Sequence, residues 1–280
     1  MTKAKAKVKK LTKKEIYAKH GIEFRNEDGK ILAPLFGWIN PLLINGNTKL
    51  GKGVWTYSTL PTNKVFELSI EGCDVKVYGT CPCHCEGCYA TKGNYCFSST
   101  KVSLARKTIL QRLYLDFVKR ALIAQIEADN IRLCRIHAAG DFDPKQPEYT
   151  TMWHEVVETC TSTLFWTYTK NPKAEHAFDD LGNINVVKSI IEGIGFNFGK
   201  CEYIIRVYHE LRRLGKSVYI CRCGIDDNQH CVNCKGCVEH TFVLFVEHST
   251  GYVAKEDPLY PELVELIESQ KSMTEELLVA

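Results

Sequence analysis

One short stretch of the chain carries four cysteines at the spacing of a metal-binding loop. Residues 81–88 read Cys-Pro-Cys-His-Cys-Glu-Gly-Cys. No helix or strand turns thiols this close in sequence toward one core, so a plain packing role does not explain them. An irregular loop can aim several sulfurs at one point, and thiolates select zinc, copper(I) or iron–sulfur clusters. We therefore expect a metal centre with ligands among Cys81, Cys83, Cys85 and Cys88.

A second group of cysteines lies near the end of the chain. Its members are Cys221, Cys223, Cys231, Cys234 and Cys237. The last three form Cys-x2-Cys-x2-Cys, which is how the bacterial ferredoxin motif begins. Zinc sites usually come as two separated Cys-x2-Cys pairs, so the contiguous triple favours an iron–sulfur cluster. A closed zinc site made by the last four members is the alternative.

Cysteine content and charge limit the class of protein. Fourteen of the 280 residues are cysteine, and the first residues lack the apolar region of a secretory signal. Clustered cysteines without an export signal indicate metal or redox chemistry in the cytoplasm rather than disulfides. No apolar run is long enough to span a bilayer, so we expect no membrane partner.

The N-terminus is rich in lysine, although the whole chain has a net charge of only +3. Eight of the first twenty residues are lysine. Such a run is usually a solvated tail. The other interpretation is an arm that binds the phosphates of a nucleic acid. None of these patterns identifies a substrate.

From residue 65 onward, the chain alternates expected strands and helices. Strands are expected at 65–70, 131–137, 163–168, 185–191, 217–221 and 241–247, and helices at 103–129, 147–160, 201–214 and 261–269. This order predicts an α/β fold with a parallel sheet and crossover helices. About six strands suit a partial, open TIM-like barrel rather than a full one of eight.

The expected organisation has three parts. Residues 1–60 would form a basic tail and an N-terminal extension. Residues 61–250 would form the α/β core, including a cysteine-rich loop at 221–240. Residues 251–280 would form a C-terminal helical segment.

Several polar residues follow the expected strands. Gly140 and Asp141 close one strand, and Lys170 closes the next. The carboxyl ends of parallel strands carry the site in such folds. We therefore expect both cysteine groups and these residues to meet at one end of the sheet. Asp141 either caps the next segment or supplies a carboxylate to a cationic ligand.

The spacing Cys81-x3-Cys85-x2-Cys88 resembles the cluster motif of the radical S-adenosylmethionine enzymes. In that superfamily the second strand ends in a Gly-Gly-Glu-like motif that holds the amino group of S-adenosylmethionine. Ala139-Gly140-Asp141 stands in that place.

This resemblance implies both a cofactor and its contacts. Three thiolates would hold a [4Fe–4S] cluster, and S-adenosylmethionine would chelate its open iron. An electron from the cluster would then cleave the sulfonium. The superfamily usually has an aromatic residue before the third cysteine, whereas here Tyr89 follows it. The residues implied at S-adenosylmethionine are Tyr89, Gly140, Asp141 and Lys170.

A closer resemblance is to the gene-product-eighty-eight family of phage and bacterial proteins, and it covers about residues 44–245. The segments that carry it are 46–52, 58–61, 85–90, 135–142, 168–170 and 231–237. This family looks distantly related to the radical S-adenosylmethionine superfamily. The resemblance implies fold and metal content and says little about the reaction.

Three functions remain open from the sequence. The first is a radical S-adenosylmethionine-like enzyme with one or two [4Fe–4S] clusters, the second of them at Cys221–Cys237. The second is a non-catalytic iron–sulfur protein for electron transfer or sensing, with Cys83 as a fourth ligand. The third is a zinc-stabilised module that binds nucleic acid through its lysine-rich N-terminus.

Overall fold

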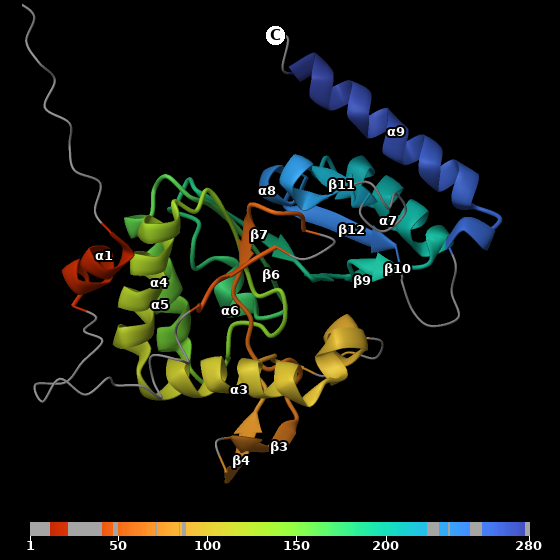
Figure 1. The fold of residues 1–280 in the computed structure, drawn as a ribbon. Helices are drawn as coiled ribbons and strands as arrows, with labels where there is room; N and C mark the ends of the chain where they lie inside the picture. The colour runs from red at the N-terminus through yellow and green to blue at the C-terminus, as the bar shows by residue number, and fades with distance from the viewer. Residues whose placement is uncertain are drawn as a thin grey trace, which may run out of the picture.

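A five-stranded sheet with helices packed against it forms the centre of the molecule, which was obtained as a computed structural model (Figure 1). The structure describes residues 12–21, 41–46, 50–70, 72–83, 85, 88–222, 230–234, 236–246 and 254–277. The expected ligand Cys223 lies outside these residues, as does most of the lysine-rich N-terminus, and the Tyr89 side chain is likewise not described.

The strand order in the central sheet is β1-β2-β5-β6-β7. Strand β1 (Ile44–Asn45) is antiparallel to β2 (Val54–Thr56), and the remaining neighbours are parallel. The parallel strands continue with β5 (Leu133–Ile136), β6 (Leu164–Thr169) and β7 (Ile184–Lys188). The connecting helices are α3 (Ser98–Leu113), α4 (Leu115–Asp129), α5 (Pro147–Thr159) and α6 (Pro172–Glu175). The predicted parallel sheet with crossover helices is confirmed.

Successive side chains along each strand point to opposite faces of this sheet. Phe165 on β6 packs into the main core together with buried residues of α4 and α5. Its neighbour Trp166 points to the opposite face and joins a second core that contains cysteines 221 and 237. Because both faces are covered, β6 is apolar along most of its length, as strands of buried parallel sheets are.

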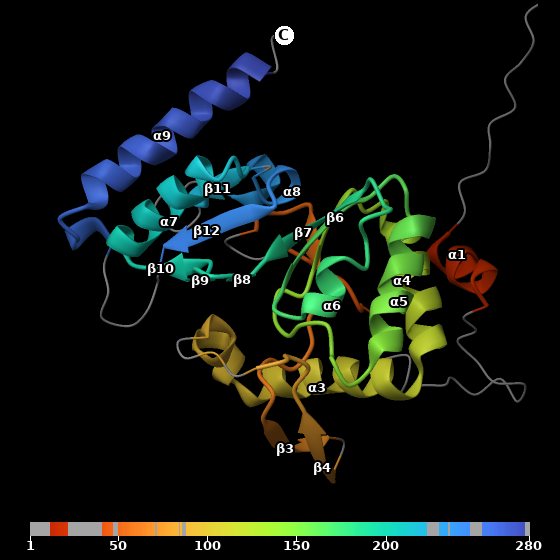
Figure 2. The same ribbon diagram turned by 180° about the vertical axis from the view of Figure 1, so that it is seen from behind.

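A second, three-stranded parallel sheet has the order β10-β12-β11. Its strands are β10 (Phe198–Gly199), β11 (Val218–Ile220) and β12 (Phe242–Val246), and the hairpin strands β8 (Ile190–Ile191) and β9 (Gly195–Phe196) precede it. Helices α7 (Cys201–Arg213) and α9 (Tyr260–Leu277) cover its core, and α8 (Gly236–Glu239) precedes β12 (Figure 2).

Backbone hydrogen bonds connect the two sheets through Asn197. The Ser189 N–H donates to the carbonyl of Thr169 on β6 (3.0 Å), and the Asn197 N–H donates to the carbonyl of Ser189 (3.2 Å). The Phe245 N–H on β12 donates in turn to the carbonyl of Asn197 (2.8 Å). These hydrogen bonds connect the parallel strands of the first sheet to those of the second. The described residues do not form a closed barrel.

Two sequence predictions are wrong in detail. The expected first strand of the parallel series, 65–70, is β3 (Val65–Ile70), but it pairs antiparallel with β4 (Cys73–Tyr78) in a separate hairpin. The first parallel strand is β2, which lies inside the expected N-terminal extension. The single helix expected over 103–129 is two helices, α3 and α4, because Tyr114 leaves helical geometry with φ −137° and ψ 49°.

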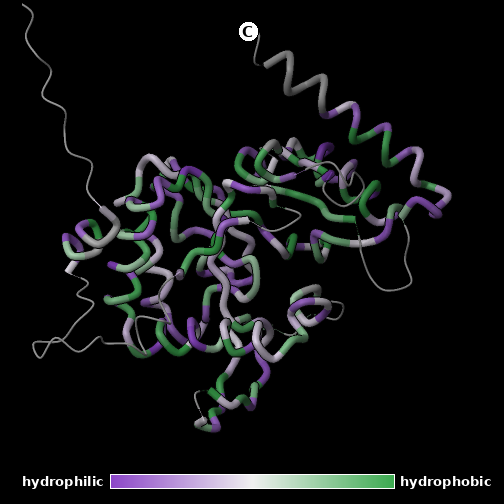
Figure 3. The backbone as a smooth tube through the Cα atoms, viewed as in Figure 1, coloured by the Kyte–Doolittle hydropathy of each residue, from purple (hydrophilic) through white to green (hydrophobic). Residues whose placement is uncertain are grey.

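The hydropathy of the backbone follows this arrangement (Figure 3). Strand β12 is hydrophobic along its whole length, whereas polar residues recur along α7. Helix α1 (Lys13–Lys19) packs beside α4, where Lys19 forms an ion pair with Glu127. None of the helices in the described ranges combines the length and apolar character that crossing a membrane requires.

Candidate metal centre and its supporting network

The first cysteine loop begins with a clamp between two backbone segments. The Thr80 N–H donates to the Leu60 carbonyl, and the Cys81 N–H donates to the Thr62 carbonyl, both at 3.0 Å. The Thr62 N–H in turn donates to Sγ of Cys81 at 3.2 Å. Thr62 has a φ of +63°, in the left-handed region that costs a β-branched residue free energy. The chain therefore holds Cys81 at a fixed place with a donor on its sulfur.

The hairpin β3–β4 brings this loop back to the end of the parallel sheet. Thr59 follows β2, Thr80 follows β4, and their hydroxyl oxygens are 2.9 Å apart. The Thr59 N–H donates to the carbonyl of Ala139 beyond β5 (2.9 Å). Gly140 has a φ of +86°, and a Cβ there would overlap the Thr59 hydroxyl. Glycine is needed at 140 because two threonine side chains occupy the space.

Asp141 joins the ends of two parallel strands. Its Oδ1 accepts from the Phe142 N–H and the Thr169 hydroxyl, each at 2.7 Å, and its Oδ2 accepts from the Lys170 N–H at 2.9 Å. The Asp141 N–H donates to the Thr80 hydroxyl at 3.0 Å. Burial raises the pKa of Asp141, while the Lys170 charge and these donors lower it. The carboxylate therefore serves the framework around the first cysteine loop.

Lys170 supplies positive charge beside the cysteines of this loop. Burial raises the pKa of Cys81 well above its ordinary value, and Asp141 raises it further, whereas Lys170 lowers it. Burial raises the pKa of Cys85 to about 11, and Lys170 again opposes the shift. Without a cation these thiols stay protonated at neutral pH. A metal would deprotonate them, as coordination does for thiols generally.

The four cysteines of the first loop lie close together. Sγ of Cys83 is 3.8 Å from Sγ of Cys85, and Cys88 interacts electrostatically with both Cys81 and Cys85. Among the described residues, no three Cys, His, Asp or Glu side chains are arranged to hold one metal ion. A single ion needs its ligands around one point, whereas cluster thiolates bind different irons and lie farther apart.

Phenol groups accompany the second cysteine group. The Tyr168 hydroxyl on β6 donates to Sγ of Cys237 at 2.7 Å. The Tyr219 hydroxyl on β11 is 3.3 Å from Sγ of Cys234. Cys221 and Cys237 are buried, and Cys231 and Cys234 are partly buried beside them in one apolar core.

The second group packs on the face of the sheet, which differs from the expectation that it would join the first group at one end. The Val232 N–H donates to the carbonyl of Leu50, which precedes β2, at 3.1 Å. The Asn185 amide, near the start of β7, donates to the carbonyls of Cys237 and His240, both at 2.9 Å. Among the described residues, β6 and the residue after it link the two groups: Tyr168 contacts the second, and Lys170 acts on the first.

Sequence reasoning missed the residues that hold the loops in place. Thr59 and Thr80 are fully buried, and their roles depend on contacts across more than twenty positions in sequence. Tyr168 lies in a segment that the family resemblance includes, yet only the fold shows that it reaches Cys237. His137 is a buried core histidine at the end of the expected strand 131–137, with Nε2 2.7 Å from the Tyr149 hydroxyl.

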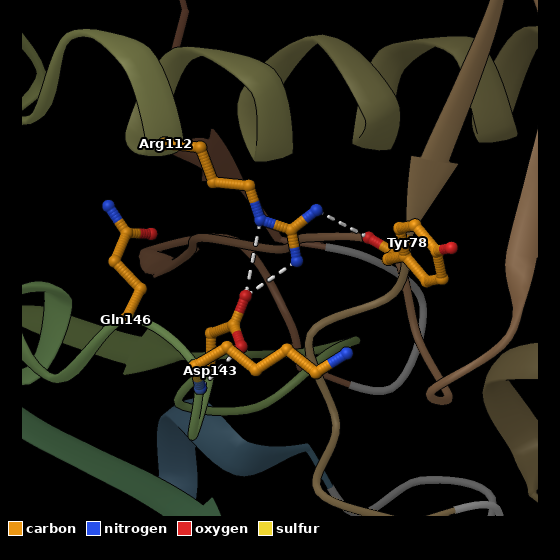
Figure 4. A pocket seen from close by; sticks show the side chains of 5 residues that line it. Tyr78, Arg112, Asp143 and Gln146 are labelled. Atoms are coloured by element: carbon orange, nitrogen blue, oxygen red, sulfur yellow. Dashed lines mark hydrogen bonds and ion pairs between the residues drawn. The ribbon is translucent and has the colours of Figure 1, made fainter.

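An open depression of about 390 Å³ lies beside the base of the first loop (Figure 4). Arg112, from the end of α3, forms an ion pair with the buried Asp143 and donates to the Tyr78 carbonyl at 2.9 Å. Lys145 and Gln146 complete the lining. The arginine is occupied by the framework, so we interpret this depression as a structural junction between α3, β4 and the segment after β5.

Comparison with known protein families identifies a match over most of the chain. The model of a family described as Gene product 88 matches residues 41–244, well over half of the 280 residues. This agrees with the resemblance that the sequence motifs carry. No curated protein and no solved structure is significantly similar to the chain.

Proposed function

We propose that this chain, which belongs to the Gene product 88 family, is an iron–sulfur protein with a radical S-adenosylmethionine-like first centre. Cys81, Cys85 and Cys88 would hold a [4Fe–4S] cluster, and cysteines 221, 223, 231, 234 and 237 would supply the ligands of a second one. The observation that carries the proposal is the first loop itself. Sγ of Cys83 lies 3.8 Å from Sγ of Cys85, Cys88 and Lys170 act electrostatically on Cys81 and Cys85, and buried threonines clamp the base of the loop.

The donor set fits such a cluster. Thiolates are the ligands that iron–sulfur clusters take, and N–H groups on the sulfurs tune their potential. The Thr62 N–H on Cys81 is a donor of this kind. The positive charge of Lys170 opposes the negative charge that several thiolates bring together.

When bound, such a cluster supplies an electron to a sulfonium ligand at its open iron. The residues of this chain would position and shield that ligand. Asp141 is already committed to Thr169 and Lys170, so its role is to hold the β5 and β6 ends together. Lys170 is then the residue that would attract the carboxylate of S-adenosylmethionine.

A second candidate function follows from one distance. Two sulfurs on a tetrahedral zinc ion are about 3.8 Å apart, given Zn–S bonds of about 2.3 Å. The separation of Cys83 and Cys85 is 3.8 Å. This separation suits two thiolates on one zinc ion and favours the zinc-stabilised alternative, because thiolates that bind different irons of a cluster lie farther apart.

The decisive experiment is the iron, sulfide and zinc content of protein purified without air. We expect iron and acid-labile sulfide at about four of each per cluster. Replacing Cys81, Cys85 and Cys88 by alanine should remove the iron and sulfide of one cluster and leave those of the other. A colourless protein that contains zinc alone would contradict the proposal.

Two control variants sharpen this test. Cys73→Ser should keep all the iron, because Cys73 is exposed at the far end of β4, about 17 Å of strand from Tyr78. Cys83→Ala should also keep the first cluster if one iron is open to S-adenosylmethionine. Loss of the cluster in Cys83→Ala would favour the closed, non-catalytic centre. Formation of 5′-deoxyadenosine by reduced protein tests the enzymatic part directly.

A further inference from the structure

Two tyrosine hydroxyls contact different sulfurs of the second cysteine group. The Tyr168 hydroxyl donates to Cys237 at 2.7 Å, and the Tyr219 hydroxyl is 3.3 Å from Cys234. The two phenols come from β6 and β11, which belong to different sheets. No single turn of the chain produces both contacts, so the fold itself converges two phenols on this group.

Both aromatic rings are fixed in place by their surroundings. The Arg135 guanidinium lies 4.7 Å from the centre of the Tyr168 ring, and the Phe245 ring packs edge-on at 5.4 Å. The Tyr219 ring stacks on His240 at 5.4 Å. A Cβ at position 236 would overlap the Tyr219 ring, so the glycine there lets α8 approach this ring closely. The hydroxyls are therefore directed at the sulfurs by packing.

We propose that Tyr168 and Tyr219 donate hydrogen bonds to thiolates of the second iron–sulfur cluster and raise its reduction potential, an inference that rests on the proposed function. An iron-bound thiolate carries no proton, so in the loaded protein the phenol must be the donor. Hydrogen bonds to cluster sulfurs are among the factors that set the potential. Reduction adds negative charge to the sulfurs, so these donors stabilise the reduced cluster more than the oxidised one.

The test compares Tyr168→Phe, Tyr219→Phe and the double variant with the unaltered protein. Each removes one oxygen and keeps the ring. We expect the midpoint potential of the second cluster, from an anaerobic redox titration followed by electron paramagnetic resonance, to shift to more negative values. The shift should be larger in the double variant, with iron and sulfide per chain unchanged. Full-length protein in which the first-loop cysteines are replaced cannot form the first cluster, so its resonance signal is assigned to the second cluster.

Tyr203→Phe is the matched control. Its hydroxyl donates to the Phe196 carbonyl at 2.8 Å, so losing it removes a phenol from the same half of the molecule without touching a sulfur. Its potential should equal that of the unaltered protein. Equal potentials in the Tyr168 and Tyr219 variants, with full iron content, would overturn the hydrogen-bond inference and leave the cluster in place.

A measurement on the unaltered protein covers the case in which a variant fails to keep its cluster. Iron–sulfur stretching bands in the resonance Raman spectrum should shift between H2O and D2O, and the shift should be smaller in whichever variant folds. Bands that do not move would overturn the inference. Iron and sulfide per chain that stay unchanged after replacement of Cys231, Cys234 and Cys237 by alanine would instead overturn the second cluster itself.

Discussion

Lys107 is a charged residue placed in the main core. It is 4% exposed, and its ammonium donates to the Leu42 carbonyl at 2.7 Å and lies 5.7 Å from the Tyr57 ring centre. Burial lowers the pKa of Lys107 to about 8. An unfolded chain holds this proton up to the ordinary pKa of 10.5, so between these values the unfolded state binds more protons.

The free energy of unfolding should therefore rise as pH increases from 8 to 10.5. The contribution of Lys107 is on the order of 3 kcal/mol, at about 1.4 kcal/mol per pKa unit. Urea unfolding at pH 7, 8, 9 and 10 should show Lys107→Met more stable than the unaltered protein at pH 7, with the difference shrinking above pH 8. Exposed Lys216→Met is the control. Curves that stay parallel for Lys107→Met would contradict a shifted lysine.

His137 shows why a pattern identifies a buried residue more easily than its conformation. An apolar run predicts burial, and His137 is 2% exposed. Its φ of +62° arises where β5 ends and the chain turns toward Gly140, and the alternation of residues does not encode this. Burial also lowers the pKa of His137 to about 3, so the folded protein keeps this imidazole neutral at neutral pH.

At the scale of single elements, α3 carries the junction beneath the first cysteine loop. Arg112 in its last turn donates to the carbonyls of Tyr78 and Gly79, which end the hairpin, and pairs with Asp143. The Asp143 side chain is 3% exposed, so this pair is largely desolvated. The arginine thereby links α3, β4 and the segment after β5 (Figure 4).

Arg112→Met should destabilise the protein by about 3 kcal/mol, because it leaves a buried carboxylate without its partner. Since Cys81 lies two residues after Gly79, the proposed first cluster should also be lost more readily. Chemical unfolding and iron content measure the two effects. Lys76→Met on the same hairpin removes an exposed ion pair with Glu67 and should cost well under about 1 kcal/mol. Equal losses of stability and iron in the two variants would show that the Arg112–Asp143 pair does not stabilise this junction.

The elements that could be predicted from sequence are those with strong local periodicity. The helices at 147–159 and 201–213 and the strands at 164–169 and 242–246 match their predicted ranges within a residue or two. The strand at 65–70 was wrongly assigned to the parallel series because the alternation of side chains is the same in parallel and antiparallel strands. Gly72, with a φ of +82°, makes the turn that separates β3 from β4.

The candidate site was only partly predictable for the same physical reason. Cysteine spacing is local, so the first loop could be recognised from the chain itself. Contacts such as Thr59 to Thr80 and Tyr168 to Cys237 join residues 21 and 69 positions apart. Only the folded arrangement of strands brings them together, and the same arrangement puts the second group on the sheet face.

At the scale of the whole molecule, the second cysteine group lies where separate parts of the chain meet. Its segment contacts the residues before β2 through Leu50, β6 through Tyr168, β7 through Asn185 and β11 through Tyr219. The main core contains neither cysteine group; it is built by α4, α5 and the strands β5 and β6. In the proposed iron–sulfur protein, the two halves of the molecule should therefore differ in how much their stability depends on the metal.

In the proposed iron–sulfur protein, removing the metal by anaerobic chelation should loosen the half of the molecule that contains residues 218–246 and leave the main core protected. Metal-bound thiolates would hold together segments that otherwise depend on a few hydrogen bonds and a small apolar core. Hydrogen exchange measured by mass spectrometry should become faster there, while α5 exchanges as slowly as before. The variant lacking Cys231, Cys234 and Cys237 should reproduce this pattern without chelator. Equally faster exchange in both halves, or no change in either half, would mean that the cysteines do not hold residues 218–246 together through a metal.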